Sequence, residues 1–374
     1  MFDLQFYLDP IFWAVGFVFL IQVLIYLLLF RKVAAYKPMP LAESFEPVTI
    51  VICAKDEDEQ LKTNLPLILE QDYPEFEVIV VDDQSYDETA DILGAFSLQY
   101  PHLKVIAIEP HINEFKGKKL ALTLAFKAAK YETLLLTDAD CTPQSKQWIK
   151  SMQSAFIDKK IEFVLGYSPY KYYGGLLNLL IRYETFYTAM QYISFALSGK
   201  PYMGVGRNLS YKKSVFFAKK GFSPYLKIAA GDDDLFVNMH ASPKRTKVQL
   251  NPESFMLSEP KRTWGEWIRQ KRRHISVSKF YKGGDKRRLG MLWLANFLFY
   301  IVIAAACFFP TQWIPALGIF SLRMIIQIII FGIAGKKLNF KYVWLAAPFM
   351  DFLFQIIIMP LMGMGSMFSK KSDW

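Results

Sequence analysis

The feature that most constrains this chain is a set of long apolar stretches. Residues 11–30 carry no charge, and Gln22 is the only strongly polar side chain among them. A helix of about 20 apolar residues crosses a hydrocarbon layer of roughly 30 Å. Three similar stretches follow residue 288, and we expect spans at Leu289–Phe309, Trp313–Ile333 and Val343–Met362. Because 21% of all residues are charged, the chain is not a pure membrane bundle. The roughly 240 residues between the spans are enough for one globular domain with its own core.

The residues around the first stretch indicate a retained anchor, predicted at 1–36, and not a cleaved signal peptide. A signal peptide has a basic leader and small residues at its cleavage site. Here the leader carries Asp3 and Asp9, and the stretch is followed by Arg31 and Lys32. Positive residues beside a span stay on the cytoplasmic side. The sequence therefore predicts a multi-pass protein of the cell membrane whose globular domain lies in the cytoplasm.

Most of the net charge of +10 lies just before the C-terminal spans. The segment from Lys261 to Arg288 has eleven Lys or Arg residues against two acidic ones. Aromatic and basic residues alternate over Trp264–Tyr281, as is typical of a helix that lies in the headgroup plane, and anionic membrane lipids are its natural partners. We predict an interfacial amphipathic segment at 259–288 and a membrane region of about three helices at 289–374. Nucleic acid is not an expected partner, because no recognition module accompanies this charge.

Between the anchor and this segment, at 37–258, strand and helix patterns alternate. Continuous apolar runs predict buried strands at Val48–Cys53, Glu77–Val81, Val105–Ile108 and Thr133–Thr137. Helical spacing predicts helices at Glu59–Gln71 and Lys118–Lys130, and Ser85 to Glu88 fit a capping box that begins another helix. This alternation predicts an α/β fold with a mostly parallel sheet and flanking helices. Ligands of such sheets bind beyond the carboxyl ends of the strands.

Two of the predicted strands end in paired acids. Asp82 and Asp83 follow the second strand, and Asp138 and Asp140 close the fourth. Because side chains two residues apart in an extended segment face the same way, Asp138 and Asp140 can point at one site. Carboxylates at this spacing suit Mg²⁺ or Mn²⁺, with phosphate oxygens and water as further ligands. The alternative is that these residues merely begin loops. Three cysteines and four histidines lack the spacing of a zinc site or a disulfide.

Four motifs in this order resemble those of family-2 glycosyltransferases, which have the GT-A fold. That group includes cellulose, hyaluronan and chitin synthases and ceramide glucosyltransferase. The resemblance covers roughly Pro47 to Tyr281. The motifs are Val81-Asp82-Asp83-Gln84-Ser85, Asp138-Ala139-Asp140, Gly231-Asp232-Asp233-Asp234-Leu235 and Gln270-Lys271-Arg272-Arg273-His274.

The resemblance implies a nucleotide-sugar donor site at the first two motifs. Asp82 and Asp83 would hold the base and ribose, and the loop from Ala54 to Glu57 would border the same pocket. Lys118 or Lys119, in Lys116-Gly117-Lys118-Lys119, would lie near the donor. Asp138 would contact donor or metal. Asp140 would be the main ligand of Mg²⁺ or Mn²⁺.

The last two motifs imply the catalytic and acceptor side. Asp233 would be the general base that deprotonates the acceptor hydroxyl, with Asp232 beside it. Gln270 and Arg273 would hold the diphosphate and the acceptor end, with Arg272 and His274 at the same place. The family's last motif usually ends in tryptophan, so His274 weakens the case for processive polymer synthesis. The acids at 232–234 also fit a simple helix start, where the helix dipole stabilises negative charge.

The resulting expectation is an inverting, metal-dependent enzyme. It would move a sugar from a UDP-sugar, such as a UDP-hexose or UDP-N-acetylhexosamine, to a lipid-linked or glycan acceptor at the cytoplasmic membrane face. The alternatives are a processive polysaccharide synthase and a non-catalytic nucleotide-sugar-binding scaffold. Gly204 to Asn208 resemble a loop near the acceptor in relatives.

Two charged residues lie within the predicted C-terminal spans. Isolated charges inside a membrane are costly and usually pair, so we expect Arg323 and Asp351 to meet between their helices. With four spans and an outside N-terminus, Lys370 and Lys371 would fall outside, against the charge rule. One C-terminal segment is therefore a candidate for an interfacial or re-entrant position.

Overall fold

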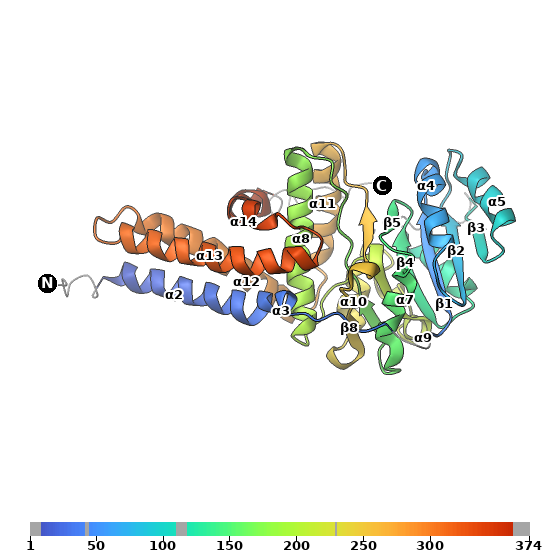
Figure 1. Ribbon diagram of the computed structural model, residues 1–374, viewed down its shortest axis with the longest axis horizontal. Coiled ribbons are helices and arrows are strands. Elements are labelled where there is room, and N and C mark those ends of the chain that lie inside the picture. The colour runs from blue at the N-terminus through green and yellow to red at the C-terminus, as the bar shows by residue number, and fades with distance from the viewer. Residues whose placement is uncertain (1–8, 42–44, 110–117, 229, 362–374) are drawn as a thin grey trace.

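The computed structural model describes residues 9–41, 45–109, 118–228 and 230–361, and it has two parts. An α/β domain forms one end of an elongated molecule, and a bundle of apolar helices forms the other (Figure 1). Asp3, the pair Lys116-Gly117, and the tail lysines Lys370 and Lys371 lie outside the described residues.

The domain is built on a seven-stranded sheet with strand order β3-β2-β1-β4-β7-β6-β8. β1, β2, β3 and β4 are mutually parallel, β7 runs antiparallel to β4 and β6, and β8 is parallel to β6. The mostly parallel sheet is confirmed, and the four predicted strands are present with small shifts at their ends. The strands are β1 Val48–Ala54, β2 Phe76–Asp82, β3 Leu103–Ala107, β4 Thr133–Asp138, β6 Phe163–Leu165, β7 Leu209–Lys212 and β8 Thr246–Val248.

Helices cover both faces of this sheet because its strands are apolar on both sides. One face packs against α4, α5 and α7, and the other packs against α6, α8, α9 and α10. A two-stranded ribbon of β5 (Cys141–Pro143) and β9 (Met256–Ser258) follows β4. The helices are α4 Asp58–Leu69, α5 Thr89–Gln99, α6 Lys119–Ala128, α7 Trp148–Gln153, α8 Gly175–Leu197, α9 Lys213–Ala218, α10 Asp234–His240 and α11 Trp264–Ser278.

The capping box predicted at Ser85 to Glu88 is wrong. Helix α5 begins at Thr89, and no side chain caps it from position 88. The Ser85 hydroxyl instead accepts a hydrogen bond from the Asp56 amide at 3.0 Å, and Asp87 accepts from the Thr89 amide at 3.0 Å. The Ser85 hydroxyl, which the local pattern predicts at the start of a helix, therefore bonds to the loop after β1 instead.

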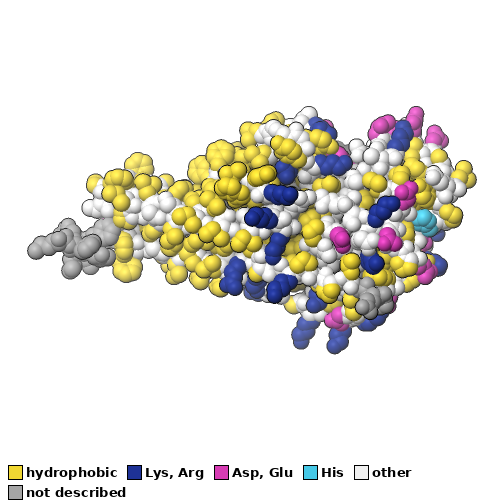
Figure 2. All heavy atoms as spheres, viewed as in Figure 1, with side chains coloured by type: hydrophobic (Ala, Val, Ile, Leu, Met, Phe, Trp, Pro, Cys, Tyr) yellow, Lys and Arg dark blue, Asp and Glu magenta, His cyan; other side chains and the backbone are white. Residues whose placement is uncertain are grey.

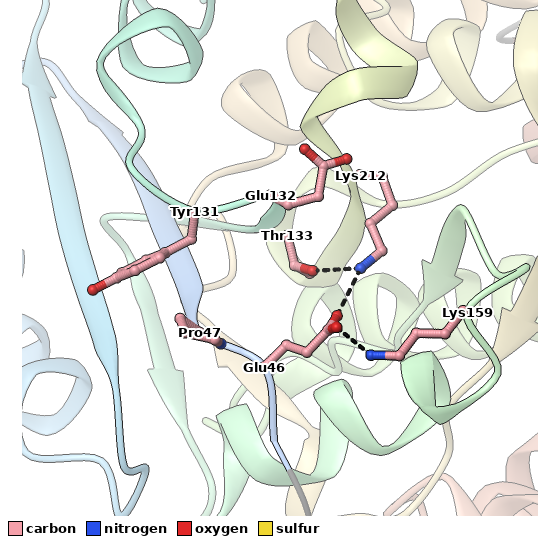
Figure 3. A pocket seen from close by; sticks show the side chains of 7 residues that line it. All are labelled: Glu46, Pro47, Tyr131, Glu132, Thr133, Lys159 and Lys212. Atoms are coloured by element: carbon pink, nitrogen blue, oxygen red, sulfur yellow. Dashed lines mark hydrogen bonds and ion pairs between the residues drawn. The ribbon is translucent and has the colours of Figure 1, made fainter.

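A charged hollow lies at the amino ends of the strands, on the edge opposite their carboxyl ends (Figure 3). Glu46, which precedes β1, bridges Lys159 and Lys212, and the Lys212 ammonium also donates to the Thr133 hydroxyl at 3.0 Å. The hydrogen bond from Lys159, assisted by Lys212, lowers the pKa of Glu46 despite partial burial. Because its charges pair with one another, this hollow fixes the entry of the chain into β1.

The long helix α8 joins the domain to the bundle. It lies crosswise between the two parts in Figure 1. On the domain side, the Tyr192 hydroxyl donates to the Gly166 carbonyl at 2.7 Å. On the bundle side, Phe186 packs edge-on against Phe331 with ring centroids 5.3 Å apart, and Tyr187 packs against Phe30. One continuous apolar core therefore extends from the sheet into the bundle.

Within the described residues, four helices are long and apolar enough to span a membrane, as the sequence predicts: Pro10–Ala34, Gly283–Ala306, Trp313–Lys337 and Val343–Leu361. The first consists of α2 (Pro10–Leu24), a π-helical segment (Ile25–Phe30) and α3 (Arg31–Ala34). Figure 1 shows α2, α12 (Gly283–Ala306) and α13 (Trp313–Lys337) along the long axis, while α14 (Val343–Phe352) is seen nearly end-on. A π-helical segment at Leu353–Ile358 continues α14.

The predicted contact between Arg323 and Asp351 is confirmed. The two side chains are fully buried and form an ion pair of 2.7 Å between α13 and α14. The Tyr300 hydroxyl donates to the same Asp351 oxygen at 2.7 Å, and Arg323 also donates to Gln327 at 2.6 Å and to Gln22 at 3.3 Å. A buried charge pair is tolerated only when such hydrogen bonds satisfy its remaining groups. This cluster therefore connects all four apolar helices.

Candidate active site

The candidate site lies where the sheet changes its winding direction. β2 and β3 extend the sheet on one side of β1, while β4 lies on the other. In α/β proteins, ligands bind outside the carboxyl ends of the strands at such a switch point, and we use the word crevice for this place in the fold. Cys53 pairs with Asp138, and Ala54 pairs with Asp82. The acids that close β2 and β4 therefore lie along one edge of the sheet.

The loops after β1 and β2 are hydrogen-bonded to each other at this edge of the sheet. Asp56 has a φ of 53°, and its carboxylate accepts from the Tyr86 amide at 2.8 Å. The Glu57 amide donates to the Thr89 hydroxyl at 3.0 Å. Asp82 is buried and accepts from the Ser85 amide at 3.1 Å, and the Asp83 amide donates to the Ala54 carbonyl at 2.8 Å. These contacts fix the predicted base and ribose residues in a rigid frame.

Lys118 neutralises the first acid of the β4 pair. Its ammonium forms an ion pair of 2.8 Å with Asp138. Burial pushes the pKa of Asp138 upward, but attraction to Lys118, followed by that of Arg207 and Arg273, outweighs this and lowers it. Burial and the charge of Asp138 raise the pKa of Asp140. The two acids thus titrate differently although they are only two residues apart.

Glu57 faces the same acids from the loop after β1. Desolvation, and then repulsion by Asp140, raise its pKa to about 7, with attraction to Lys118 opposing the shift. The crevice therefore gathers carboxylates that repel one another, and a cation would relieve this repulsion.

The residues at this edge fit a divalent ion. Among the described residues, no group of three or more His, Cys, Asp or Glu side chains is placed to hold a metal. Mg²⁺ is commonly bound through one or two carboxylates, with substrate phosphates and water completing its shell. Asp138 and Asp140 supply such a pair, and Cys141 donates to an Asp140 oxygen at 3.3 Å.

A third acidic group lies at the start of α10. Gly231 has a φ of 91°, which a glycine adopts readily. Asp233 accepts from the amides of Gly206 and Asp234, both at 2.6 Å. Desolvation and the charges of Asp232 and Asp234 raise the pKa of Asp233 to about 8. The Tyr281 hydroxyl donates to Asp234 at 2.6 Å. Asp233 thus has the elevated proton affinity that suits a general base near neutral pH.

Lys119 points to this third group and not to the β4 acids. Its buried ammonium donates to the carbonyls of Ile228 and of Ala230, the latter at 2.7 Å. It also lies over the Tyr225 ring, 5.4 Å from the centroid. Of the two predicted donor-side lysines, Lys118 borders the crevice, while Lys119 holds the segment that leads into α10.

The basic helix α11 closes the site on the bundle side. Thr263 and Glu266 form a capping box at its start. Gln270 and Arg273 are partly buried, whereas Arg272 and His274 are exposed. The positive charge of Arg273 helps to lower the pKa of Asp138. Lys271 forms a buried ion pair with Glu184 of α8, which fixes α11 to the helix beside the bundle.

Comparison with known proteins shows the family of this chain. A family model described as Glycosyltransferase like family 2 matches residues 46–276. This chain belongs to that family. The sequence resemblance to family-2 glycosyltransferases is therefore confirmed, and the chain has a GT-A-type fold.

Two curated relatives are only distantly similar to this chain. Probable glycosyltransferase YdaM of Bacillus subtilis (strain 168) is 24% identical over 273 residues, which are 68% of this chain and 62% of the relative. Glycosyltransferase AglE of Haloferax volcanii is 30% identical over 146 residues, which are 38% and 46% of the two chains. This chain thus spans less than two thirds of either relative's length.

A solved structure shows the same fold. Mannosyltransferase PcManGT from Pyrobaculum calidifontis, in complex with GDP-Man and Mn²⁺, has a TM-score of 0.56 and 19% sequence identity. The match covers 91% of this chain and 97% of that chain.

The structure adds Arg207, a residue that the motif analysis placed only within a loop. Its guanidinium lies over the Tyr170 ring, 4.3 Å from the centroid, and one of its terminal nitrogens is buried without a hydrogen-bond partner. Its charge acts on both Asp138 and Asp140. The only sequence signal was the glycine-rich loop from Gly204 to Asn208. Neither the ring beneath Arg207 nor the acids beside it are close in sequence, so the signal was weak.

Proposed function

We propose that this glycosyltransferase moves a sugar, with inversion, from a nucleoside-diphosphate donor to a lipid-linked or glycan acceptor at the cytoplasmic membrane face. UDP is the proposed nucleotide. One observation carries the proposal: the Lys118 ammonium is attracted by both Asp138 and Asp232. An acid of β4 and an acid just before α10 therefore both act on this one ammonium, which supports a site where a donor and a base meet.

The donor half is supported by the crevice between β1 and β4. The rigid loops around Asp82 and Asp83 suit a nucleoside, and the cations Lys118 and Arg273 suit a diphosphate. The solved relative PcManGT is described with GDP-Man and Mn²⁺, a sugar nucleotide and a divalent ion. We assign Asp140, with Asp138, to Mg²⁺ or Mn²⁺. When bound, this ion supplies positive charge that stabilises the leaving diphosphate.

The chemistry requires a base opposite the leaving group. The acceptor oxygen attacks the anomeric carbon, the bond from that carbon to the diphosphate oxygen breaks, and its electron pair stays on the diphosphate. We assign the acceptor's proton to Asp233, whose pKa of about 8 lets it accept a proton and release it again. Lys118 and Arg273 stabilise the charge that develops on the diphosphate. Attack from the side opposite the leaving group inverts the anomeric centre.

The acceptor half is supported by the position of α11. This helix carries Gln270 and Arg273, and its buried Lys271 is paired with Glu184 of α8, the helix that packs on the apolar bundle. An acceptor anchored in lipid would thus approach the crevice from the bundle side. We assign Gln270, Arg272 and His274 to the acceptor end on this basis.

The test uses the purified full-length protein in lipid nanodiscs. Release of nucleoside diphosphate is measured over a panel of UDP- and GDP-sugars with Mg²⁺ or Mn²⁺, and the labelled product is then identified. We expect turnover with one nucleotide class, its loss on chelation, and its loss in Asp140→Asn. Asp91→Asn, at an exposed position on α5, is the matched control and should be fully active. Turnover that survives both chelation and Asp140→Asn would refute the metal assignment.

Two further measurements separate the alternatives. A non-catalytic scaffold would bind donor without turnover, so turnover that Asp233→Asn abolishes while donor binding persists identifies an enzyme. A processive synthase would form long products from the first turnovers, whereas single transfer gives one added sugar. We expect single transfer, because His274 stands where the family usually has tryptophan.

A further inference from the structure

An exposed aromatic tip precedes α8. Tyr172, Tyr173 and Leu176 are 73%, 47% and 57% exposed. Between them, Gly174 and Gly175 have φ values of 74° and 79°, which only glycine adopts readily, so the chain turns sharply here. Side chains of this size seldom cluster on a surface that meets only water. We call residues 172–176 the tyrosine tip.

The tyrosine tip is held in place and is not a loose loop. Asn178, in the first turn of α8, accepts from the Tyr173 amide at 3.1 Å and donates to the Lys171 carbonyl at 3.0 Å. The Tyr173 hydroxyl donates to Glu259 at 2.8 Å. Arg262 lies over the Tyr173 ring, 3.8 Å from its centroid. Because Glu259 and Arg262 directly precede α11, the tip is fixed to the start of that helix.

One arginine sets the depth of the tip relative to the bundle. Arg182 lies over the Tyr172 ring, 5.0 Å from the centroid, and also over the Phe340 ring, 4.4 Å from the centroid. Phe340 belongs to the turn between α13 and α14, at the domain end of two apolar helices. Tyr172 therefore lies level with the domain end of α13, which is where that helix would leave a hydrocarbon layer that it spans. This turn also exposes Lys341 and Tyr342.

Positive charge surrounds the tip at this level. Figure 2 shows a band of Lys and Arg side chains where the apolar bundle meets the domain. Near the tip, Glu259 is paired with Lys171 at 2.6 Å and with Arg262 at 3.6 Å, which leaves Arg182 and Lys341 as further cations. Tyrosine rings with polar ends, flanked by basic residues, are typical of the headgroup layer of a membrane.

We propose that the tyrosine tip docks in the headgroup layer of an anionic bilayer. Tyr172 and Leu176 enter the boundary between headgroups and acyl chains, while Arg182 and Lys341 contact lipid phosphates. The docked tip holds the start of α11 against the membrane surface. This inference depends on the apolar helices crossing the bilayer and not on the chemistry of the active site.

The test measures the depth of a spin label in nanodiscs of phosphatidylcholine and phosphatidylglycerol. The exposed Cys307 is replaced by serine; Cys53 and Cys141 are buried. Labels are then attached in Tyr172→Cys and Leu176→Cys. Ile325→Cys, on the lipid-facing side of α13, and Leu98→Cys, 90% exposed on α5 far from the bundle, give the hydrocarbon and water references. Collision rates with oxygen and with a water-soluble nickel chelate report the depth.

We expect labels at 172 and 176 to collide with the nickel chelate several-fold less often than the label at 98. Their oxygen collisions should lie between those of the two references. Arg182→Gln should increase the exposure of the label at 172 to water. A label at 172 that is as accessible to the nickel chelate as the one at 98 would overturn the proposal. Protection of the label at 172 by protein instead of lipid would also overturn the proposal. Mass photometry in detergent-free buffer would then detect a bound second copy or another bound protein.

Discussion

The proton affinity of Asp233 makes the pH dependence of turnover a direct test of its role. A base must be ionised to accept a proton, so the rate below its pKa rises with pH and levels off above it. With a pKa of about 8, Asp233 is ionised in about one molecule in eleven at pH 7 and in about ten of eleven at pH 9. We therefore expect kcat/KM to rise about tenfold between these values.

A single substitution should move this rise. After desolvation, the charges of Asp232 and Asp234 raise the pKa of Asp233. The Asp234 carboxylate accepts from the Leu235 amide with one oxygen and from the Tyr281 hydroxyl with the other. Asp234→Asn removes one charge and keeps one of these two acceptors. Loss of a like charge at this range lowers a pKa by about one unit, or 1.4 kcal/mol. The rise in kcat/KM should shift to lower pH by about one unit.

The assay is transfer from the identified donor between pH 6 and 9.5 at constant ionic strength and saturating metal. Asp91→Asn serves as the control, since its exposed carboxyl on α5 is not among the groups that shift the pKa of Asp233, and its profile should match the parent's. The reasoning fails if the parent shows no rise across this range, or if Asp234→Asn keeps the parent's midpoint.

Four further predictions follow from the same contacts. Asp233→Asn should abolish turnover, yet at pH 9 the variant should have a higher Tm than the parent. The pKa of Asp233 is higher in the folded than in the unfolded protein, so its ionisation at high pH destabilises the fold. A lower Tm would indicate that Asp233 only caps α10. Glu57→Gln should flatten the increase of apparent Mn²⁺ affinity between pH 6 and 8, since the pKa of about 7 disappears with the carboxyl. Lys119→Met should lower kcat about tenfold or more with little change in the donor KM, because it releases the segment before α10; a donor KM effect of equal size would place it at the donor. Arg323→Met should lower the free energy of unfolding by about 3–5 kcal/mol, because it leaves the buried charge of Asp351 unpaired. The double variant with Asp351→Leu should recover most of that loss in thermal unfolding; if the losses of the two single variants add up instead, the two residues do not act as a pair.

The parts of the fold that could be predicted are those coded by local pattern. β1 is an unbroken apolar run, so its position follows from the sequence. The strands β6, β8 and β9 have three residues each and are held by partners far along the chain, such as Thr246 opposite Phe163. No local pattern marks such strands. For the same reason the order of the strands beyond β4 could not be read from the sequence.

Those residues of the candidate site that lie at the ends of strands could be predicted from the sequence. Asp82 and Asp138 lie at strand ends that parallel pairing brings to one edge. The different orientations of Lys118 and Lys119 could not be predicted, because adjacent residues at a helix start diverge according to the tertiary partners available. The raised pKa values of Glu57 and Asp233 arise from burial among residues distant in sequence, so they too required the folded chain.

The continuous core that runs from the sheet through α8 into the bundle has a consequence for how this protein can be prepared and studied. Rings such as Phe30 and Phe331 complete the packing of Phe186 and Tyr187, so the catalytic half lacks a closed surface of its own on that side. A soluble truncation without the bundle would expose the apolar side chains of α8 that pack against it, beneath the helix α11 proposed to support the acceptor. Where the apolar helices span a bilayer, its thickness and lipid packing would therefore affect the positions of the residues at the candidate active site.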